Sequence, residues 1–245
     1  MKRCYYHVTE MVVLALDSTA RLGSCAVLRE AIVLAARTSD PAAPAATQLP
    51  GVLDALLAEA SVTLAEVDVF AVAVGPGSFT GLRVGIACMQ GLAFAHRRPL
   101  VGVSALEALA RLARGTGSIA DDAPRRVATW VDAWRGEVYA AVYEAVHEGL
   151  ALVEGPTVEM PSAVLDRLAT APTLFIGDGV GASVDLIRAQ GQAHVIAPVL
   201  APPLAATIAE MAREAARAGR CPPPHAITPL YVRRPGAERV RVGGA

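Results

Sequence analysis

Two short segments combine glycine, hydroxyl and charged residues at spacings that suit the binding of an anion. The first, Gly75-Pro76-Gly77-Ser78-Phe79-Thr80-Gly81-Leu82-Arg83, lies between an all-apolar run and a stretch with helical spacing. A turn between a strand and a helix can direct backbone N–H groups at a phosphate. However, Thr80 stands where a dinucleotide loop has its third glycine, and Gly81 is not followed by the lysine of a Walker loop. Ser78 also lacks the flanking glycines of a nucleophile elbow. A tight turn capped by hydroxyls and a ligand site both remain open.

The second segment, Asp17-Ser18-Thr19, ends the apolar run 12–16 and begins a turn that closes at Gly23. The later run 127–131 ends in the same way, with Asp132-Ala133-Trp134-Arg135-Gly136 before a returning strand. Two halves that open alike suggest internal duplication, although a short pattern of this kind also arises by chance. Two halves, each opening with a β-hairpin, describe the actin-like ATPase architecture, in which this turn is a phosphate loop. Asp17, Ser18 and Thr19 are therefore candidates to bind a nucleotide phosphate with Mg²⁺, or they simply cap the turn.

The composition excludes several classes of protein. The chain has 245 residues, 53% of them hydrophobic, and a net charge of −1, so no basic surface argues for direct nucleic-acid binding. Four widely spaced cysteines indicate free thiols in a reducing compartment, which favours the cytoplasm. The five histidines are scattered, and no metal site is predicted. The sequence shows no membrane-spanning run of about 18 apolar residues, and its start is too polar for a signal peptide.

The apolar periodicity predicts an α/β fold of two related lobes, the second reduced. We expect strands at 12–16, 24–28, 32–37, 69–74, 100–103, 127–131, 138–143 and 174–176, and helices at 47–59, 82–95, 104–114 and 204–218. Residues 1–11 are expected to be a frayed extension and 12–114 the first lobe. Residues 115–125 would be a linker, 126–228 the second lobe, and 229–245 a basic tail.

Two predicted helices have faces that suit a partner. Leu49, Val52, Leu53 and Leu56 recur at helical spacing. The helix at 82–95 is apolar nearly all round, which is typical of a helix buried between layers or at an interface. Its small residues, spaced four apart, would let another helix approach closely: Gly81 and Gly85, and Ala87, Gly91 and Ala95.

The segment Gly75–Arg83 closely resembles the hallmark of the TsaB (YeaZ) family. The resemblance covers about residues 12–235 and includes Val13–Thr19, Pro99–Ser104, Asp132–Tyr139, Gly177-Asp178-Gly179 and Pro229-Leu230-Tyr231. It implies an actin-like (ASKHA, RNase H-like) fold and a partner subunit without catalytic activity of its own. With the catalytic subunit TsaD and the ATPase TsaE, such a subunit serves to form N6-threonylcarbamoyladenosine at position 37 of tRNAs that read codons beginning with A.

The resemblance also implies an interface, a heterodimer with TsaD or a homodimer, formed by the two helices described above. The residues expected there are Leu49, Val52, Leu53, Leu56, Gly81, Leu82, Arg83, Gly85, Ile86 and Met89. Gly75 to Thr80 would form the structural turn before the second helix. No cofactor is expected in this chain, while ATP or ADP with Mg²⁺ would belong to the complex, and tRNA contact would be indirect. The family's usual His-Ser-Glu-like segment reads Ala45-Ala46-Thr47-Gln48-Leu49-Pro50 here, which favours a chain without metal or catalysis.

Two further functions stay open at this point. The chain would be an independent actin-like small-molecule kinase or an M22-type peptidase if its own residues bound a substrate, although no general base stands beside a nucleophile.

Trp130 and Trp134 flank the second hairpin, where packing in the core or a lid is favoured over base stacking. Arg233, Arg234, Arg239 and Arg241 make the tail basic, which indicates a solvated segment or a weak contact with tRNA.

Overall fold

The computed structural model describes residues 10–20, 22–39, 45–115, 124–147, 149–168, 171–191, 194–197 and 201–233, with the side chains of 45–47 excluded. Most of the predicted extension, linker and basic tail lie outside the described residues. Met11, which the prediction assigned to the extension, is buried, and its N–H donates to Glu30 Oε1 at 2.7 Å. This residue therefore belongs to the first lobe.

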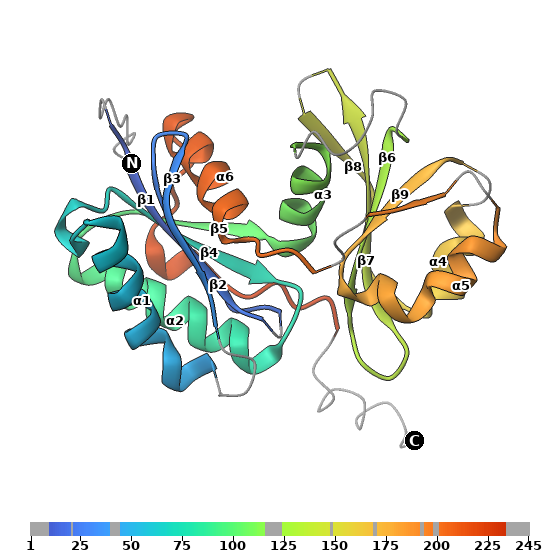
Figure 1. The fold of residues 1–245 in the computed structure, drawn as a ribbon, viewed down its shortest axis with the longest axis horizontal. Coiled ribbons are helices and arrows are strands. Elements are labelled where there is room, and N and C mark those ends of the chain that lie inside the picture. Colours follow the sequence, from blue (N-terminus) through green and yellow to red (C-terminus); the bar gives the residue numbers. More distant parts are fainter. Residues whose placement is uncertain are drawn as a thin grey trace, which may run out of the picture.

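Two five-stranded sheets with the same topology form the two lobes (Figure 1). In each, the central strand is the first of its meander and pairs antiparallel with the second, which pairs antiparallel with the third. On its other side the central strand pairs parallel with a later strand, which in turn pairs parallel with the outermost strand. The first sheet has the order β3-β2-β1-β4-β5 and the second β8-β7-β6-β9-β10. The strands are β1 Val12–Asp17, β2 Ser24–Arg29, β3 Ile32–Thr38, β4 Val69–Gly75, β5 Leu100–Ser104, β6 Arg126–Asp132, β7 Val138–Val146, β8 Gly149–Glu159, β9 Thr173–Ile176 and β10 Val195–Ile196.

This repeated topology confirms the predicted α/β actin-like architecture. The second sheet has as many strands as the first, and its reduction lies in the shortness of β9 and β10. The helices are α1 Ala45–Ala60, η1 Leu64–Glu66, α2 Phe79–Ala95, α3 Ala105–Gly115, α4 Pro161–Leu168, η2 Asp178–Ser183, α5 Val184–Ala189, α6 Ala205–Arg217 and η3 Pro224–Ala226. In the described part of the chain, no helix is both long and apolar enough to cross a bilayer.

The layers follow from the alternation of side chains along buried strands. On β1, Leu14 and Leu16 face α1 and α2, whereas Val13 and Ala15 face α3 and α6. On β6, Trp130 faces α4 and α5, and Val131 faces the same middle layer as Val13. Helices α3 and α6 thus lie between the two sheets, and one apolar core extends through both lobes (Figure 1).

The position of α6 differs from the prediction, which placed residues 126–228 in the second lobe. Helix α6 packs against β1, β2, β4 and β5 of the first sheet. Its first N–H group, that of Ala205, donates to the buried Ser24 Oγ at 3.1 Å. A polar side chain of β2 therefore satisfies one of the unpaired N–H groups at this helix end. Although α6 follows the second sheet in the sequence, it packs as part of the first lobe.

Candidate functional site

The predicted phosphate loop is closed by its own hydrogen bonds. Asp17, Ser18 and Thr19 are all less than 5% exposed. Asp17 Oδ1 accepts hydrogen bonds from the Thr19 N–H at 2.8 Å and from Thr19 Oγ1 at 2.6 Å. Ser18 Oγ donates to the carbonyl oxygen of Gly81 at 2.8 Å. The polar groups that would bind a phosphate are therefore engaged within the chain.

The carboxyl of Asp17 also lies in an unusual electrostatic environment. Burial raises the pKa of this carboxyl, the hydrogen bonds from Thr19 oppose the rise, and the nearby charge of Asp178 adds to it. Among the described residues, no three histidine, cysteine or acidic side chains lie together as a possible metal site.

The turn of the second lobe repeats this local geometry. Asp132 Oδ1 accepts a hydrogen bond from the Trp134 N–H at 2.8 Å, two residues ahead, as Asp17 does from Thr19. The Asp132 N–H in turn donates to Asp178 Oδ1 at 2.9 Å. Burial raises the pKa of Asp178, and this backbone hydrogen bond opposes the rise. The two turns match in geometry as well as in sequence, which supports the inferred duplication.

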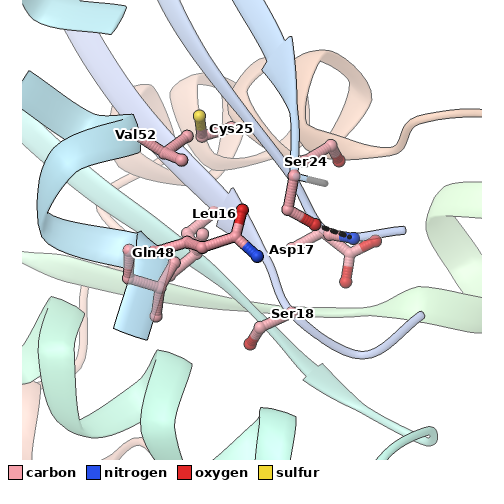
Figure 2. Close-up of a pocket in the computed structure, with 10 residues that line it drawn as sticks. Leu16, Asp17, Ser18, Ser24, Cys25, Gln48 and Val52 are labelled. Atoms are coloured by element: carbon pink, nitrogen blue, oxygen red, sulfur yellow. Dashed lines mark hydrogen bonds between the residues drawn. The ribbon is translucent and has the colours of Figure 1, made fainter. Parts of the chain in front are cut away.

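A small cavity lies beside the first turn, where α1 covers the end of β1. Its lining includes Asp17, Ser18, Cys25, Gln48 and Val52, and Figure 2 shows Gln48 extending from α1 over the end of β1. The volume open to a water-sized sphere is about 10 Å³. Such a space holds about one water molecule. It is too small for a nucleotide.

The glycine-rich segment Gly75–Thr80 forms a tight junction that packs on this first turn. Ser78 is the N-cap of α2, and its Oγ accepts a hydrogen bond from the Gly81 N–H at 3.2 Å. The Ser78 N–H donates to the carbonyl oxygen of Thr19 at 2.8 Å. A Cβ on Gly77 would lie 2.5 Å from that same oxygen. Thr80 lies in the first turn of α2 and is exposed. Backbone contacts of this segment thus hold the start of α2 against the first turn.

Most of the residues expected at a partner interface are buried within this chain. Side chains from α1 and α2 form the core over the first sheet: Leu49, Leu53, Leu56, Leu82, Ile86 and Met89 are each at most 8% exposed. Val52 is partly buried against the same core. These side chains therefore pack within the chain itself, and their role in a partner interface stays a prediction. For α2, the sequence did not separate the two faces, because a helix that is apolar all round does not reveal which face its own sheet takes.

Gly81 and Gly85 likewise serve packing within the chain. A Cβ on Gly81 would lie 2.0 Å from the carbonyl oxygen of Ser18, and one on Gly85 would lie 2.0 Å from Ser18 Oγ. Arg83 alone of the predicted set is exposed. Its guanidinium carbon lies 3.9 Å from the centre of the Phe79 ring, and its Nε donates to Tyr231 Oη at 2.9 Å.

The outward face of α2 carries a different set of residues. Ala87, Gly91, Phe94 and Ala95 are exposed, and Phe94 is 83% exposed. A Cβ on Gly91 would meet no atom within 4 Å. The sequence showed the four-residue spacing of these small residues. Only the structure shows that they face outward, whereas Gly81 and Gly85 face the first turn of their own chain.

A larger cavity, the inter-lobe pocket, was not foreseen. It has a volume of about 370 Å³ and lies between the α2 junction, the turn after β6 and the segment 230–233. Trp134, expected in the core or a lid, is 53% exposed and lines this pocket, whereas Trp130 is fully buried. The one feature of the sequence that could have indicated this pocket is the presence of aromatic residues beside the glycine-rich segment and in the second turn.

Comparisons with known proteins agree with this architecture. The TsaD family model, described as tRNA N6-adenosine threonylcarbamoyltransferase, matches residues 42–239. The tRNA threonylcarbamoyladenosine biosynthesis protein TsaB of Escherichia coli K12 is 32% identical over 74% of this chain and 77% of that protein. The TsaB protein of Bacillus subtilis is 28% identical over 68% of this chain and 71% of its own length.

Among solved structures, YeaZ from Pseudomonas aeruginosa is 32% identical, and the alignment covers 90% of this chain and 99% of that one with a TM-score of 0.76. A second structure from the same organism, described as similar to the peptidase YeaZ, gives 31% identity, the same TM-score and coverage of 91% and 100%. The glycine-rich junction, the two matching lobes and these alignments together establish that the chain belongs to the TsaB (YeaZ) family.

Proposed function

We propose that this chain is the non-catalytic partner subunit of the complex that forms N6-threonylcarbamoyladenosine at position 37 of tRNA, and that it activates a TsaD-type catalytic subunit by forming a heterodimer with it. The names of its relatives in Escherichia coli and Bacillus subtilis support the pathway. In this proposal the chain works in the cytoplasm together with TsaE, contacts tRNA only through the complex, and leaves ATP or ADP with Mg²⁺ to the complex.

The observation that carries the subunit role is the outward face of α2. Ala87, Gly91 and Ala95 form a shallow surface beside the exposed ring of Phe94. Small residues allow two helix backbones to approach closely, and a large exposed apolar side chain commonly marks an interaction site. We place the interface on this face in place of the buried residues of α1 and α2. The same face would serve a homodimer.

The state of the first turn supports the absence of catalysis. A kinase of this architecture would need Asp17, Ser18 and Thr19 to face an open nucleotide site. In this chain they are buried and hydrogen-bonded to their own lobe, and burial raises the pKa of Asp17.

A pair of matched substitutions tests the interface. Ala87→Trp places a bulky ring on the outward face of α2, and Ala189→Trp places the same ring on an exposed alanine of α5 in the second lobe. Both variants should unfold at the temperature of the natural chain, since both sites are exposed. We expect Ala87→Trp alone to abolish co-purification with a TsaD-type subunit and to abolish tRNA modification measured by mass spectrometry of nucleosides.

Two results would overturn the proposal. If Ala87→Trp assembled and supported modification as well as Ala189→Trp, the interface would lie elsewhere. If the purified chain alone modified tRNA from threonylcarbamoyl-adenylate, the non-catalytic role would be wrong.

A further inference from the structure

One late segment of the chain reaches from the first lobe to the second. Residues 224–233 follow α6, begin with η3 beside α2, and end at Arg233, which contacts the turn after β6 (Figure 1). We call this segment the strap. It links the lobes at the inter-lobe pocket, in addition to the core that lies between the two sheets.

The beginning of the strap is fixed to the first lobe. Ile227 is 8% exposed and belongs to the core over the first sheet. Gln90 Nε2 of α2 donates to the carbonyl oxygens of Pro224 and Ile227, both at 2.9 Å. The Leu230 N–H donates to the carbonyl oxygen of Val74 in β4 at 2.7 Å. A buried side chain and three hydrogen bonds to the backbone of the strap therefore hold this end in place.

The middle of the strap rests on the start of α2. The ring centre of Tyr231 lies 5.7 Å from that of Phe79, at an angle of 32° between the rings. Arg83 Nε donates to Tyr231 Oη at 2.9 Å, and its guanidinium carbon lies 3.9 Å from the centre of the Phe79 ring. These three side chains satisfy one another, so they direct the strap toward the second lobe.

The end of the strap contacts the second lobe through a weaker set of interactions. Arg233 forms an ion pair with Glu137, and its guanidinium carbon lies 6.0 Å from the centre of the Tyr139 ring. The side chains of Arg233 and Glu137 are 30% and 33% exposed. Ion pairs that solvent reaches stabilise a fold only slightly, and salt screens them. This end can therefore detach at a much lower cost than the end that holds Ile227.

The strap is thus fixed firmly at one end and weakly at the other. We propose that it is a reversible clasp, whose Arg233 end opens from and closes on Glu137 while its Ile227 end stays in the first lobe. Tyr231, Val232 and Arg233 line the inter-lobe pocket, so opening removes one wall of that pocket. The clasp thereby controls access to the space between the lobes. This inference is independent of the proposed subunit role, since it rests on contacts within the chain.

Limited proteolysis of the full chain with trypsin reports the opening directly. Trypsin must bind the side chain of Arg233 before it cuts the bond that follows, and that side chain becomes free only when it leaves Glu137. When the clasp opens and closes faster than trypsin cuts, the rate follows the open fraction. Mass spectrometry of the new C-terminus measures this rate. We expect Glu137→Gln to increase it by about 1.5- to 5-fold, the range for an ion pair that solvent reaches.

A second substitution in the same hairpin supplies the matched control. Glu144→Gln removes the same charge from β7 and should leave the rate of cleavage after Arg233 unchanged. Salt provides a further comparison. Sodium chloride should accelerate the cleavage of the natural chain more than that of Glu137→Gln, because only the natural chain has the ion pair that salt screens.

Exchanging the two charges separates the clasp from other effects of the substitutions. Arg233→Glu places two like charges at the contact, so deuterium uptake by residues 230–233 should become faster. Combining it with Glu137→Arg restores opposite charges, and uptake should return toward that of the natural chain. Peptide mass spectrometry measures this uptake without requiring trypsin to recognise residue 233.

Either of two results would refute the clasp. If Glu137→Gln and Glu144→Gln were cut after Arg233 at the same rate, the ion pair would not hold the strap. If cleavage after Arg233 were no faster than global unfolding of the chain, the strap would be a permanent part of the fold and would not open by itself.

Discussion

Two glycines of α2 give opposite predictions for one and the same substitution. A Cβ on Gly85 would lie 2.0 Å from Ser18 Oγ and 3.1 Å from Ser18 Cβ, whereas a Cβ on Gly91 would meet no atom within 4 Å. We therefore expect Gly85→Ala to destabilise the protein and Gly91→Ala to stabilise it. The two positions share a helix and its backbone conformation, so the difference isolates the contact with Ser18.

The magnitude follows from three contributions to the free energy of unfolding. Overpacking a filled core costs about 1–3 kcal/mol. Ser18 Oγ can move away only by giving up its buried hydrogen bond to the Gly81 carbonyl, which costs about 1 kcal/mol. Replacing glycine by alanine inside a helix returns about 1 kcal/mol. Gly85→Ala should thus lower the unfolding free energy by about 1–3 kcal/mol, and Gly91→Ala should raise it by about 0.5–1 kcal/mol.

Urea unfolding of the purified chain, followed by circular dichroism, measures both changes. The measurement is made at two protein concentrations, because self-association would add to the apparent stability. A double-mutant cycle with Ser18→Ala removes the clashing oxygen, so the double variant should be more stable than the sum of the single effects predicts, by about 1 kcal/mol or more. Equal effects of Gly85→Ala and Gly91→Ala, or strict additivity in the cycle, would refute this account of the junction.

Three further predictions concern buried groups. Leu56→Ala should lower the unfolding free energy by about 2–5 kcal/mol, while Asp54→Ala, at an exposed position of the same helix, should change it by less than about 0.5 kcal/mol; similar values in urea unfolding would contradict the burial of Leu56. Because burial raises the pKa of Asp17, the folded chain binds that proton more tightly than the unfolded chain does, so this carboxyl contributes less stability as the pH rises above about 4. The difference in unfolding free energy, that of Asp17→Asn minus that of the natural chain, should therefore increase from about pH 4 to about pH 7. A difference that stays constant over this range would rule out the raised pKa of Asp17. Burial raises the pKa of Cys25 to about 11, so its alkylation at pH 8, followed by peptide mass spectrometry, should be slow until urea unfolds the protein, and rapid alkylation of the folded chain would contradict this burial.

The apolar strands could be predicted because burial on both faces leaves continuous apolar runs. The predicted strand 12–16 lies within one residue of the observed Val12–Asp17, and 69–74 within one residue of Val69–Gly75. Strand β8 was missed because it is an edge strand with exposed and partly exposed positions along its whole length and a Gly155-Pro156 pair inside it. Such a strand lacks the apolar pattern that burial imposes.

The candidate site was harder to predict, because side chains from distant segments determine it. The sequence predicted a helix at residues 204–218, but no local pattern tells which sheet a helix covers. Helix α2 is apolar on both faces, so the sequence did not separate Gly85, which meets Ser18, from Gly91, which meets nothing. Phe79, Trp134 and Tyr231 come from three separate segments, and only the folded chain brings them to one pocket.

The contact of α6 with the first sheet has a consequence for synthesis on the ribosome. Ser24 of β2 and Ala205 of α6 are 181 residues apart in sequence, and the core between the sheets includes Ile208 and Met211 from this late helix. At a synthesis rate of about 5–20 residues per second, roughly 10–40 seconds pass between the synthesis of β2 and that of α6, the helix that covers the inner face of the first sheet. The second lobe is synthesised in full during that interval. The lobe that begins the chain is therefore the last to be completed, and until then its apolar face is the surface that a chaperone would have to shield.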